Sequence, residues 1–402
     1  MGLYQTGRNV AVSYKARASG AYGDAAAVGA GATVLRPISG GLNFTKNPIE
    51  SAENRRDGMT TRGRHGQHAV AGSYQCELGV GSFDDLFAAA FRSAWAAAVT
   101  VTQATMSTAT LTCTSSVITA TAGSFLTAGV RVGDVIVFTA GLTGNLNKNL
   151  RVVGLTATTI TVAEVLTVIG TAVTTWSFGI KRKLIQTPTL TETDFSFEEY
   201  EADIDASERF DGVRVGGFSL EMSPNGMVRA TFNLVGQKMT PLTSASAPYF
   251  TSPVASVSLP LSVADASIRL GSESLLDVTA FTLNFDVSAG PASVIASPYT
   301  PDVFTNLAKV TGSITTLRRS LDQVSNFVNE TQLALHVLLA EADAEPKDFF
   351  ALCMTNLVLG GANKSALGAD GPRTQELPIM VGIDEAGGAY DATMLKLVRS
   401  NA

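Results

Sequence analysis

The sequence predicts a mainly β protein of the α+β class, with two tandem β domains that each carry a helix. One observation is a repeat: a Gly-Ser strand leading into a Ser-x-Asp helix start occurs at 72–87 and again at 312–324. A long-period repeat of a whole unit indicates domain duplication. The other is a change of composition at residue 99, after which charged residues become rare and Thr, Val and Ala dominate. This change predicts a small inserted all-β domain, Ig-like or barrel.

Length and composition agree with this fold class. The 402 residues are enough for two or three domains. Charged residues make up only 16% and there are 37 glycines, a composition that suits sheets and turns more than helical bundles. A surface with so little charge indicates that much of it is buried against other subunits.

The first domain is expected to comprise residues 1–98 and 181–245. A strand is predicted near Ala32–Arg36 and another from Gly72. In the second segment, alternating apolar and polar residues flank the turn Ser223–Gly226, whose Asn-Gly pair is a strong hairpin signal.

A helix is predicted from Ser82. Ser82 and Asp85 resemble a capping box, and apolar residues recur at three- and four-residue spacing as far as Trp95. The spacing predicts one apolar face that packs on a sheet.

Residues 44–68 form a polar stretch with almost no apolar periodicity, and we expect a long loop without secondary structure. Such loops inside a compact domain are usually functional or stabilised by a partner.

The inserted domain is expected at 99–180, where Thr, Val and Ala dominate. Strands are predicted at 109–114, 117–122, 135–139, 150–155, 159–165 and 173–178, separated by turn glycines.

The second domain is expected at 246–402. Its predicted strands are 278–287, 310–317, 333–339, 352–359 and one that ends at Gly382. A helix is predicted near Ser320–Glu330, and 360–373 reads as a Gly/Ala/Asn-rich loop.

The sequence offers no catalytic constellation, and we expect neither a catalytic residue nor a cofactor. His65 and His68 form at most half of a metal site, and no Cys or carboxylate cluster completes it. The cysteines are scattered without CxxC spacing, which favours small buried hydrophobic residues over a metal site or a disulfide framework. No segment reads as a membrane span.

Charge is unevenly distributed. Residues 1–68 carry nine bases and four acids, whereas 192–211 carry nine acids and one base. Complementary subunit contacts would use such a pattern. Nucleic-acid binding by the basic stretch, a merely solvated acidic face and a calcium loop around Asp203 and Asp205 stay open at this stage.

Several motifs follow one another in an order that resembles a known family. They are the Gly20–Asp24 opening, Arg55-Arg56-Asp57 in the polar stretch, the Gly-Ser strand before Ser82–Asp85, Phe210-Asp211-Gly212, the second unit Val310–Ser313 and, in the insert, Gly123–Gly129 with Val132–Asp134. The series is similar to the major tail tube protein of long, flexible-tailed (siphovirus-type) bacteriophages. The resemblance implies that each tandem domain is a β-sandwich or barrel with a flanking helix. It also implies a non-enzymatic virion protein whose stacked rings form the tube through which DNA passes.

The resemblance also implies roles for particular residues. The polar stretch corresponds to a family loop that reaches the neighbouring ring, which makes its charged residues contact candidates: Lys46, Glu53, Arg55, Arg56, Arg62 and Arg64. Tube lumens in the family tend to be acidic, and the candidates for a lumen or interface surface are Glu198, Glu199, Glu201, Asp203 and Asp205.

Because the domain occurs twice, a ring of three chains presenting six domains is favoured over a homohexamer. The implied partners are further copies of the chain and the tape measure, tail terminator and distal tail proteins, with assembly in the bacterial host cytoplasm. Another self-assembling phage or secretion-tube component, such as a decoration protein, is the alternative.

Overall fold

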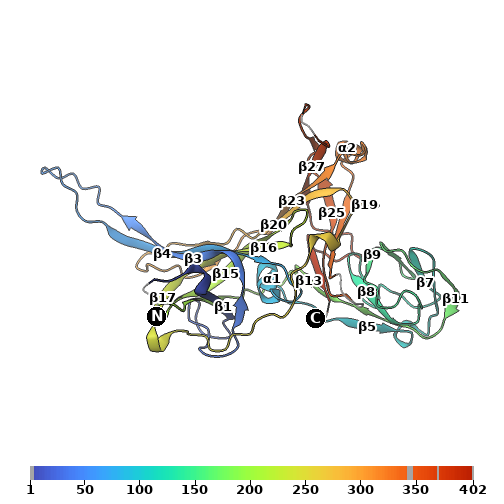
Figure 1. Cartoon of the computed structure of the whole chain (residues 1–402), viewed down its shortest axis with the longest axis horizontal. Helices are drawn as coiled ribbons and strands as arrows, with labels where there is room; N and C mark the ends of the chain where they lie inside the picture. The colour runs from blue at the N-terminus through green and yellow to red at the C-terminus, as the bar shows by residue number, and fades with distance from the viewer. Residues whose placement is uncertain (1–3, 342–346, 369–370, 401–402) are drawn as a thin grey trace.

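The computed structural model describes residues 4–341, 347–368 and 371–400 and is mainly β, with 48% strand and 7% helix. Figure 1 shows three regions: a β body with a long two-stranded arm, a second β body that carries the C-terminus, and a module built from residues 99–180. The expected mainly β class is therefore confirmed.

One set of eight strands precedes residue 246. It comprises β1 (Val10–Ala16), β2 (Thr33–Leu35), β3 (Pro37–Ile49), β4 (Arg64–Glu77), β14 (Phe195–Glu201), β15 (Ala206–Met222), β16 (Arg229–Gly236) and β17 (Lys238–Thr243), with helix α1 (Asp84–Phe91) after β4. Antiparallel pairing links β2–β1–β14–β15–β17 in one layer and β3–β4–β16–β15 in the other.

A second set of eight strands repeats this order. It comprises β18 (Ala266–Leu270), β19 (Glu273–Leu275), β20 (Val278–Asp286), β23 (Lys309–Leu317), β24 (Leu333–Ala340), β25 (Phe349–Leu359), β27 (Thr374–Val381) and β28 (Lys396–Arg399), with α2 (Asp322–Val328) after β23. The layers are β19–β18–β24–β25–β28 and β20–β23–β27–β25. The identical pairing order supports the proposed duplication, while the exact domain limits stay a prediction.

Residues 99–180 fold as a separate sheet with its own core. Its strands are β5 (Val99–Thr102), β6 (Leu111–Cys113), β7 (Val117–Ala120), β8 (Val135–Ala140), β9 (Leu150–Leu155), β10 (Thr159–Val162), β11 (Ile169–Val173) and β12 (Ser177–Ile180). They pair in the order β11–β6–β7–β10–β9–β8–β12–β5. The core includes Phe138, Trp176 and Phe178. The sequence missed β5 and merged β11 and β12 into one strand.

Four short strands complete the sheets: β13 (Arg182–Ile185), which pairs with β28, the pair β21 (Gly290–Pro291) and β22 (Val303–Phe304), and β26 (Asn363–Lys364), which pairs with β27. Short 3₁₀ helices lie at Gly7–Asn9, Ala104–Met106, Ser244–Ser246 and Val263–Asp265.

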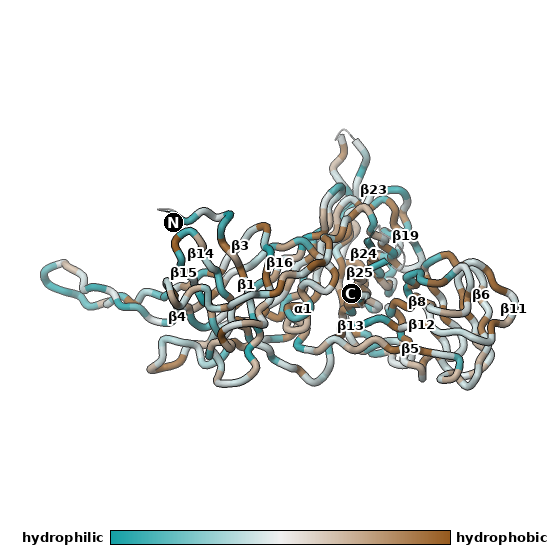
Figure 2. Tube along the Cα trace, turned by 60° about the horizontal axis from the view of Figure 1, so that its bottom comes forward, coloured by the Kyte–Doolittle hydropathy of each residue, from teal (hydrophilic) through white to brown (hydrophobic). Residues whose placement is uncertain are grey.

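The prediction of a structureless loop at 44–68 is wrong. β3 continues to Ile49 and β4 starts at Arg64, so only residues 50–63 lie outside the ladder. Together they form the arm of Figure 1, and Figure 2 shows that its outer part is largely hydrophilic. A two-stranded ribbon exposed on both faces satisfies its backbone by cross-strand bonds. It needs no apolar alternation, so the sequence carried no strand signal.

The predicted loop at 360–373 is also partly wrong, because β26 continues the line of β25 along β27. Residues 369 and 370 of that segment lie outside the described residues.

The helix α1 is shorter than predicted. It ends at Phe91 because Arg92 adopts a left-handed conformation (φ 53°). The capping box is not formed: Ser82 Oγ lies 2.7 Å from Ser256 Oγ instead. The apolar face is confirmed, since Leu86, Phe87 and Phe91 are buried in the main core, which runs through both sets of strands.

Candidate subunit interface

The two sets of strands join edge to edge inside the chain. Gly217–Met222 of β15 pairs antiparallel with Phe281–Asp286 of β20, with Phe218 opposite Phe285 and Leu220 opposite Leu283. The β3–β4–β16–β15 and β20–β23–β27–β25 layers therefore form one continuous sheet. We call these two the inner layers, and the sheet that they form the inner sheet. We call the pairing of β15 with β20 the internal junction.

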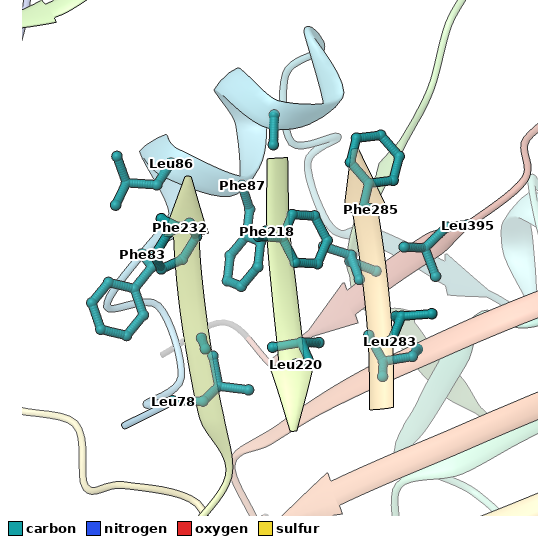
Figure 3. Close-up of a cluster of buried hydrophobic side chains, with 14 of the residues drawn as sticks. Leu78, Phe83, Leu86, Phe87, Phe218, Leu220, Phe232, Leu283, Phe285 and Leu395 are labelled. Carbon is teal, nitrogen blue, oxygen red and sulfur yellow. The ribbon is translucent and has the colours of Figure 1, made fainter. Parts of the chain in front are cut away.

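Helix α1 covers the internal junction. The Phe91 ring stacks on Phe285 with 4.8 Å between centroids, and Phe87 contacts Phe218 edge-on at 5.0 Å. Figure 3 shows the Phe87 and Phe218 rings between the helix and the strands. Phe87 also reaches Phe350 of β25 (5.5 Å), so one helix packs against both sets of strands.

A glycine permits the close approach of the two strands. A Cβ placed on Gly217 would lie 2.3 Å from the Phe285 carbonyl oxygen. No side chain fits there without moving β20, so the internal junction requires glycine at this position.

Among the residues that the structure describes, each inner layer has one free edge outside this junction: β3 in the first layer and β25 with β26 in the second. By pairing order β3 corresponds to β20, and β25 with β26 corresponds to β15. Leu42 and Leu283 lie opposite Gly72 and Gly312, the glycines of the repeated Gly-Ser strands. Leu42-Asn43-Phe44 thus matches Leu283-Asn284-Phe285, an identical tripeptide that the sequence analysis overlooked.

The second free edge carries a matching pair of glycines. Val215 and Leu359 occupy equivalent ladder positions, and each is followed by Gly-Gly, so that Gly361 corresponds to Gly217. A Cβ on Gly361 would meet only ordinary contacts, the nearest being 3.5 Å from Asn363. The close backbone contact that Phe285 makes with Gly217 therefore has no counterpart at Gly361, although Gly361 is itself buried.

The free edge of β3 contacts one of the predicted acids. The Leu42 N–H points away from β4 and donates to Glu199 Oε1 at 3.0 Å. The Tyr74 hydroxyl donates to the same oxygen. Burial, and then the Glu199 charge, raise the pKa of Tyr74, so the phenol remains a donor.

The other predicted acids serve contacts within the chain. Glu198 is 1% exposed and accepts from Ser207 Oγ and from the Tyr249 and Phe250 amides. It is therefore not a surface residue.

Nearer the surface, Asp203 accepts from Thr6 and Asn9, and these bonds lower its pKa. Asp205 accepts from Tyr200 Oη at 3.2 Å, and Glu201 is half-buried at the end of β14.

The predicted contact residues are spread along the arm. Lys46 lies on β3 and Arg64 on β4, whereas Glu53, Arg55, Arg56 and Arg62 lie in the connecting segment 50–63. Arg55 pairs with Asp57 at 2.7 Å, an exposed contact that contributes little.

The base of the arm is supported by residues 287–308 from the other set of strands. The His68 ring lies edge-on between the rings of Phe44 (5.2 Å) and Tyr299 (4.9 Å). The backbone N–H of His68 donates to the Pro298 carbonyl at 2.7 Å. Burial lowers the pKa of His68, which favours the neutral ring. This histidine packs against aromatic rings, and no metal role is needed to explain it.

The face of the inner sheet opposite α1 is polar and sparsely charged. One ladder row across β4, β16, β15, β20 and β23 consists of uncharged polar side chains: Gln75, Thr231, Ser219, Asn284 and Thr311. Other rows carry the acids Glu77, Glu221, Asp286 and Glu376 and the bases Arg214, Arg229 and Lys309. None of the acids predicted for the lumen lies on this face.

The 99–180 module is docked on the second set of strands by buried charges. Lys396, 2% exposed, lies 3.0 Å from Asp134 of the module and 2.6 Å from Asp391. Lys183 contacts the same two acids. Burial alone would lower the pKa of Lys396, but the two carboxylates outweigh it and the pKa is raised, so the lysine stays charged.

The sequence model of a family described as phage tail tube protein matches residues 7–381, nearly the whole chain. The chain belongs to this family. No curated protein matches it. Membership indicates a structural protein that self-assembles into a tube in the virion tail, in agreement with two free, matching sheet edges on one subunit.

The described part of this tail tube family member holds no group of three or more His, Cys, Asp or Glu side chains arranged to bind a metal ion. Among the same residues, no helix has the length and apolar character needed to span a membrane. Cys76, Cys113 and Cys353 are buried free thiols, as predicted.

Proposed function

We propose that the chain is the tube subunit of a long-tailed, siphovirus-type phage, and that three copies close into a ring of six equivalent units. The observation that carries this proposal is the match between the internal junction and the two free edges. If β3 of one copy pairs with β25 and β26 of the next as β20 pairs with β15, every inner sheet edge is satisfied. Closure removes the exposed edges that otherwise cause uncontrolled pairing.

The internal junction supplies the register of this contact. Phe218 lies opposite Phe285 in the internal junction, and the equivalent pair between copies is Ala362 opposite Phe44. Likewise, Ser219 lies opposite Asn284, and the equivalent pair is Asn363 opposite Asn43. The proposed pairing is thus specified residue by residue.

The polar face opposite α1 is proposed as the lumen lining. Its charged side chains on the strands comprise four acids and three bases, and its central row is uncharged. Such a face makes few attractive phosphate contacts, so DNA passes without the counterion release that accompanies tight binding.

Rings are proposed to stack through the arm, with Lys46, Glu53, Arg55, Arg56, Arg62 and Arg64 reaching the next ring. Head-to-tail stacking gives an open filament. The Glu201–Asp205 end of the acidic segment stays a candidate outer or inter-ring surface.

The module at 99–180 is proposed as an outward decoration. The proposed partners are other copies, the tape measure, tail terminator and distal tail proteins, and the viral DNA in transit. Assembly is proposed in the host cytoplasm.

A double cysteine variant tests both the ring and its size. Asn43→Cys with Asn363→Cys places one thiol on each edge, facing each other in neighbouring copies at a pair where cross-strand side chains lie close. We expect hollow filaments in negative stain and, after oxidation, a non-reducing gel ladder that stops at three chains. A ladder to six indicates a homohexamer; no filaments and no ladder reject the tube.

The slipped pair Asn43→Cys with Lys364→Cys is the matched control. Because a one-residue shift turns a side chain to the opposite face, this pair should not cross-link.

A further inference from the structure

The contact between Glu199 and the β3 edge indicates a role in subunit pairing. We propose that Glu199 protects this edge from wrong partners and selects the strand that pairs with it. In the free subunit its carboxylate accepts a hydrogen bond from the Leu42 N–H. On assembly it forms an ion pair with the Lys364 ammonium of the next copy. The proposal rests on the ring contact proposed above and adds a named residue pair to it.

This hydrogen bond lies in the path of the incoming strand. Leu42 corresponds to Leu283, which faces Leu220 across the internal junction. In the free subunit the Leu42 N–H donates to Glu199, and it points to the side where the backbone of the next copy must pair. An unpaired strand edge invites wrong partners, and a charged side chain on it discourages them.

The incoming strand brings a lysine to this point. Lys364 occupies the ladder position of Leu220, opposite Gln375 as Leu220 is opposite Ala230. Leu220 is fully buried, whereas Lys364 is exposed in the free subunit. In the same pairing Lys364 would point inward between the layers, where an unpaired ammonium is costly. Glu199 is the carboxylate that already reaches Leu42.

This pairing also fixes the register. A shift by one residue would turn Lys364 to the polar face and bring Asn363 or Ser365 inward, leaving Glu199 without its cation. Only the register of the internal junction brings the two charges together.

The corresponding strand of the other set has no such acid. β24 reads Leu-Ala-Leu-His-Val-Leu-Leu-Ala and carries no carboxylate. The β20 edge in this set is paired with β15 within the chain, so it needs no side chain to protect it from wrong partners.

A labelled peptide of residues 356–366 tests the proposal by fluorescence anisotropy. The native peptide and its Lys364→Glu form are titrated with the wild-type, Glu199→Lys and Glu201→Lys proteins. We expect the wild-type protein to prefer the native peptide by about tenfold or more. Glu199→Lys should reverse this preference.

Glu201→Lys is the matched control, because Glu201 lies two residues along the same strand and should leave the preference intact. Equal shifts from both substitutions, or no peptide binding to any protein, overturn the proposal. Negative stain of the wild-type protein separates the two ideas. If tubes form but the peptides bind equally well, only the proposed role of Glu199 is rejected. If the native peptide is preferred but no tubes form, only the proposed tube function is rejected.

Discussion

At the scale of single residues, two glycines in equivalent positions face different surroundings. A Cβ on Gly217 would collide with the Phe285 carbonyl of β20, whereas one on Gly361, which is also buried, would meet only ordinary contacts. Within the subunit, Gly361 has no packing reason to be glycine. The proposed neighbour supplies one, because its Phe44 carbonyl would approach as Phe285 approaches Gly217.

Gly361→Val should therefore abolish assembly without affecting the fold. We expect the free energy of unfolding to change by about 1 kcal/mol or less, because a Cβ at this buried position meets only ordinary contacts. Gly217→Val should cost about 1–3 kcal/mol through overpacking. Denaturant titration and negative stain measure the two effects. Normal tubes from Gly361→Val would contradict the proposed edge contact; Gly170→Val, where nothing lies within 4 Å, is the neutral control.

At the scale of elements, the 99–180 module is more than a tethered decoration. It supplies Asp134 to the pair of lysines, and Arg151 donates to Ser267 on β18 at 2.9 Å. Val135 packs with Phe349 and Val398 of the second set of strands. Its orientation is therefore fixed by buried polar and apolar contacts together.

Asp134→Ala should loosen this docking strongly. It leaves Lys183 and Lys396 with one shared carboxylate, and removing one partner of a buried ion pair costs about 3–5 kcal/mol. We expect a lower thermal midpoint and faster proteolysis between the module and β13. The exposed Asp265→Ala serves as control and should change neither measurement. Identical melting of the two variants would mean that the buried charges do not stabilise the docking.

At the scale of the whole molecule, the two sets of strands differ in the shape of one hairpin. The β3–β4 hairpin projects as an arm, while the equivalent β20–β23 connection folds back onto its base through Pro298 and Tyr299. A ring of three chains would present three arms rather than six, giving the proposed stacking contact threefold symmetry.

Replacing residues 51–62 with a short Gly-Ser turn should separate ring closure from stacking. The edge residues Leu42–Phe44 lie outside the deleted segment, so rings should still form, but filaments should not. Sedimentation velocity and negative stain distinguish the two products. The control replaces the exposed connection between β9 and β10 of the module, residues 156–158. Full-length filaments from the arm variant would exclude the arm as the stacking contact.

The sequence by itself determined the β class and the presence of a helix after each Gly-Ser strand, and it predicted the duplication and the inserted module. These follow from local patterns: alternation, turn residues and repeated motifs. Only the tertiary structure decided that the polar stretch is a ribbon, that Glu198 is buried and that Glu199 caps an edge. The reason is physical: backbone pairing between distant strands leaves no local side-chain pattern. In the same way, whether a carboxylate faces water or a buried amide depends on which strands lie beside it.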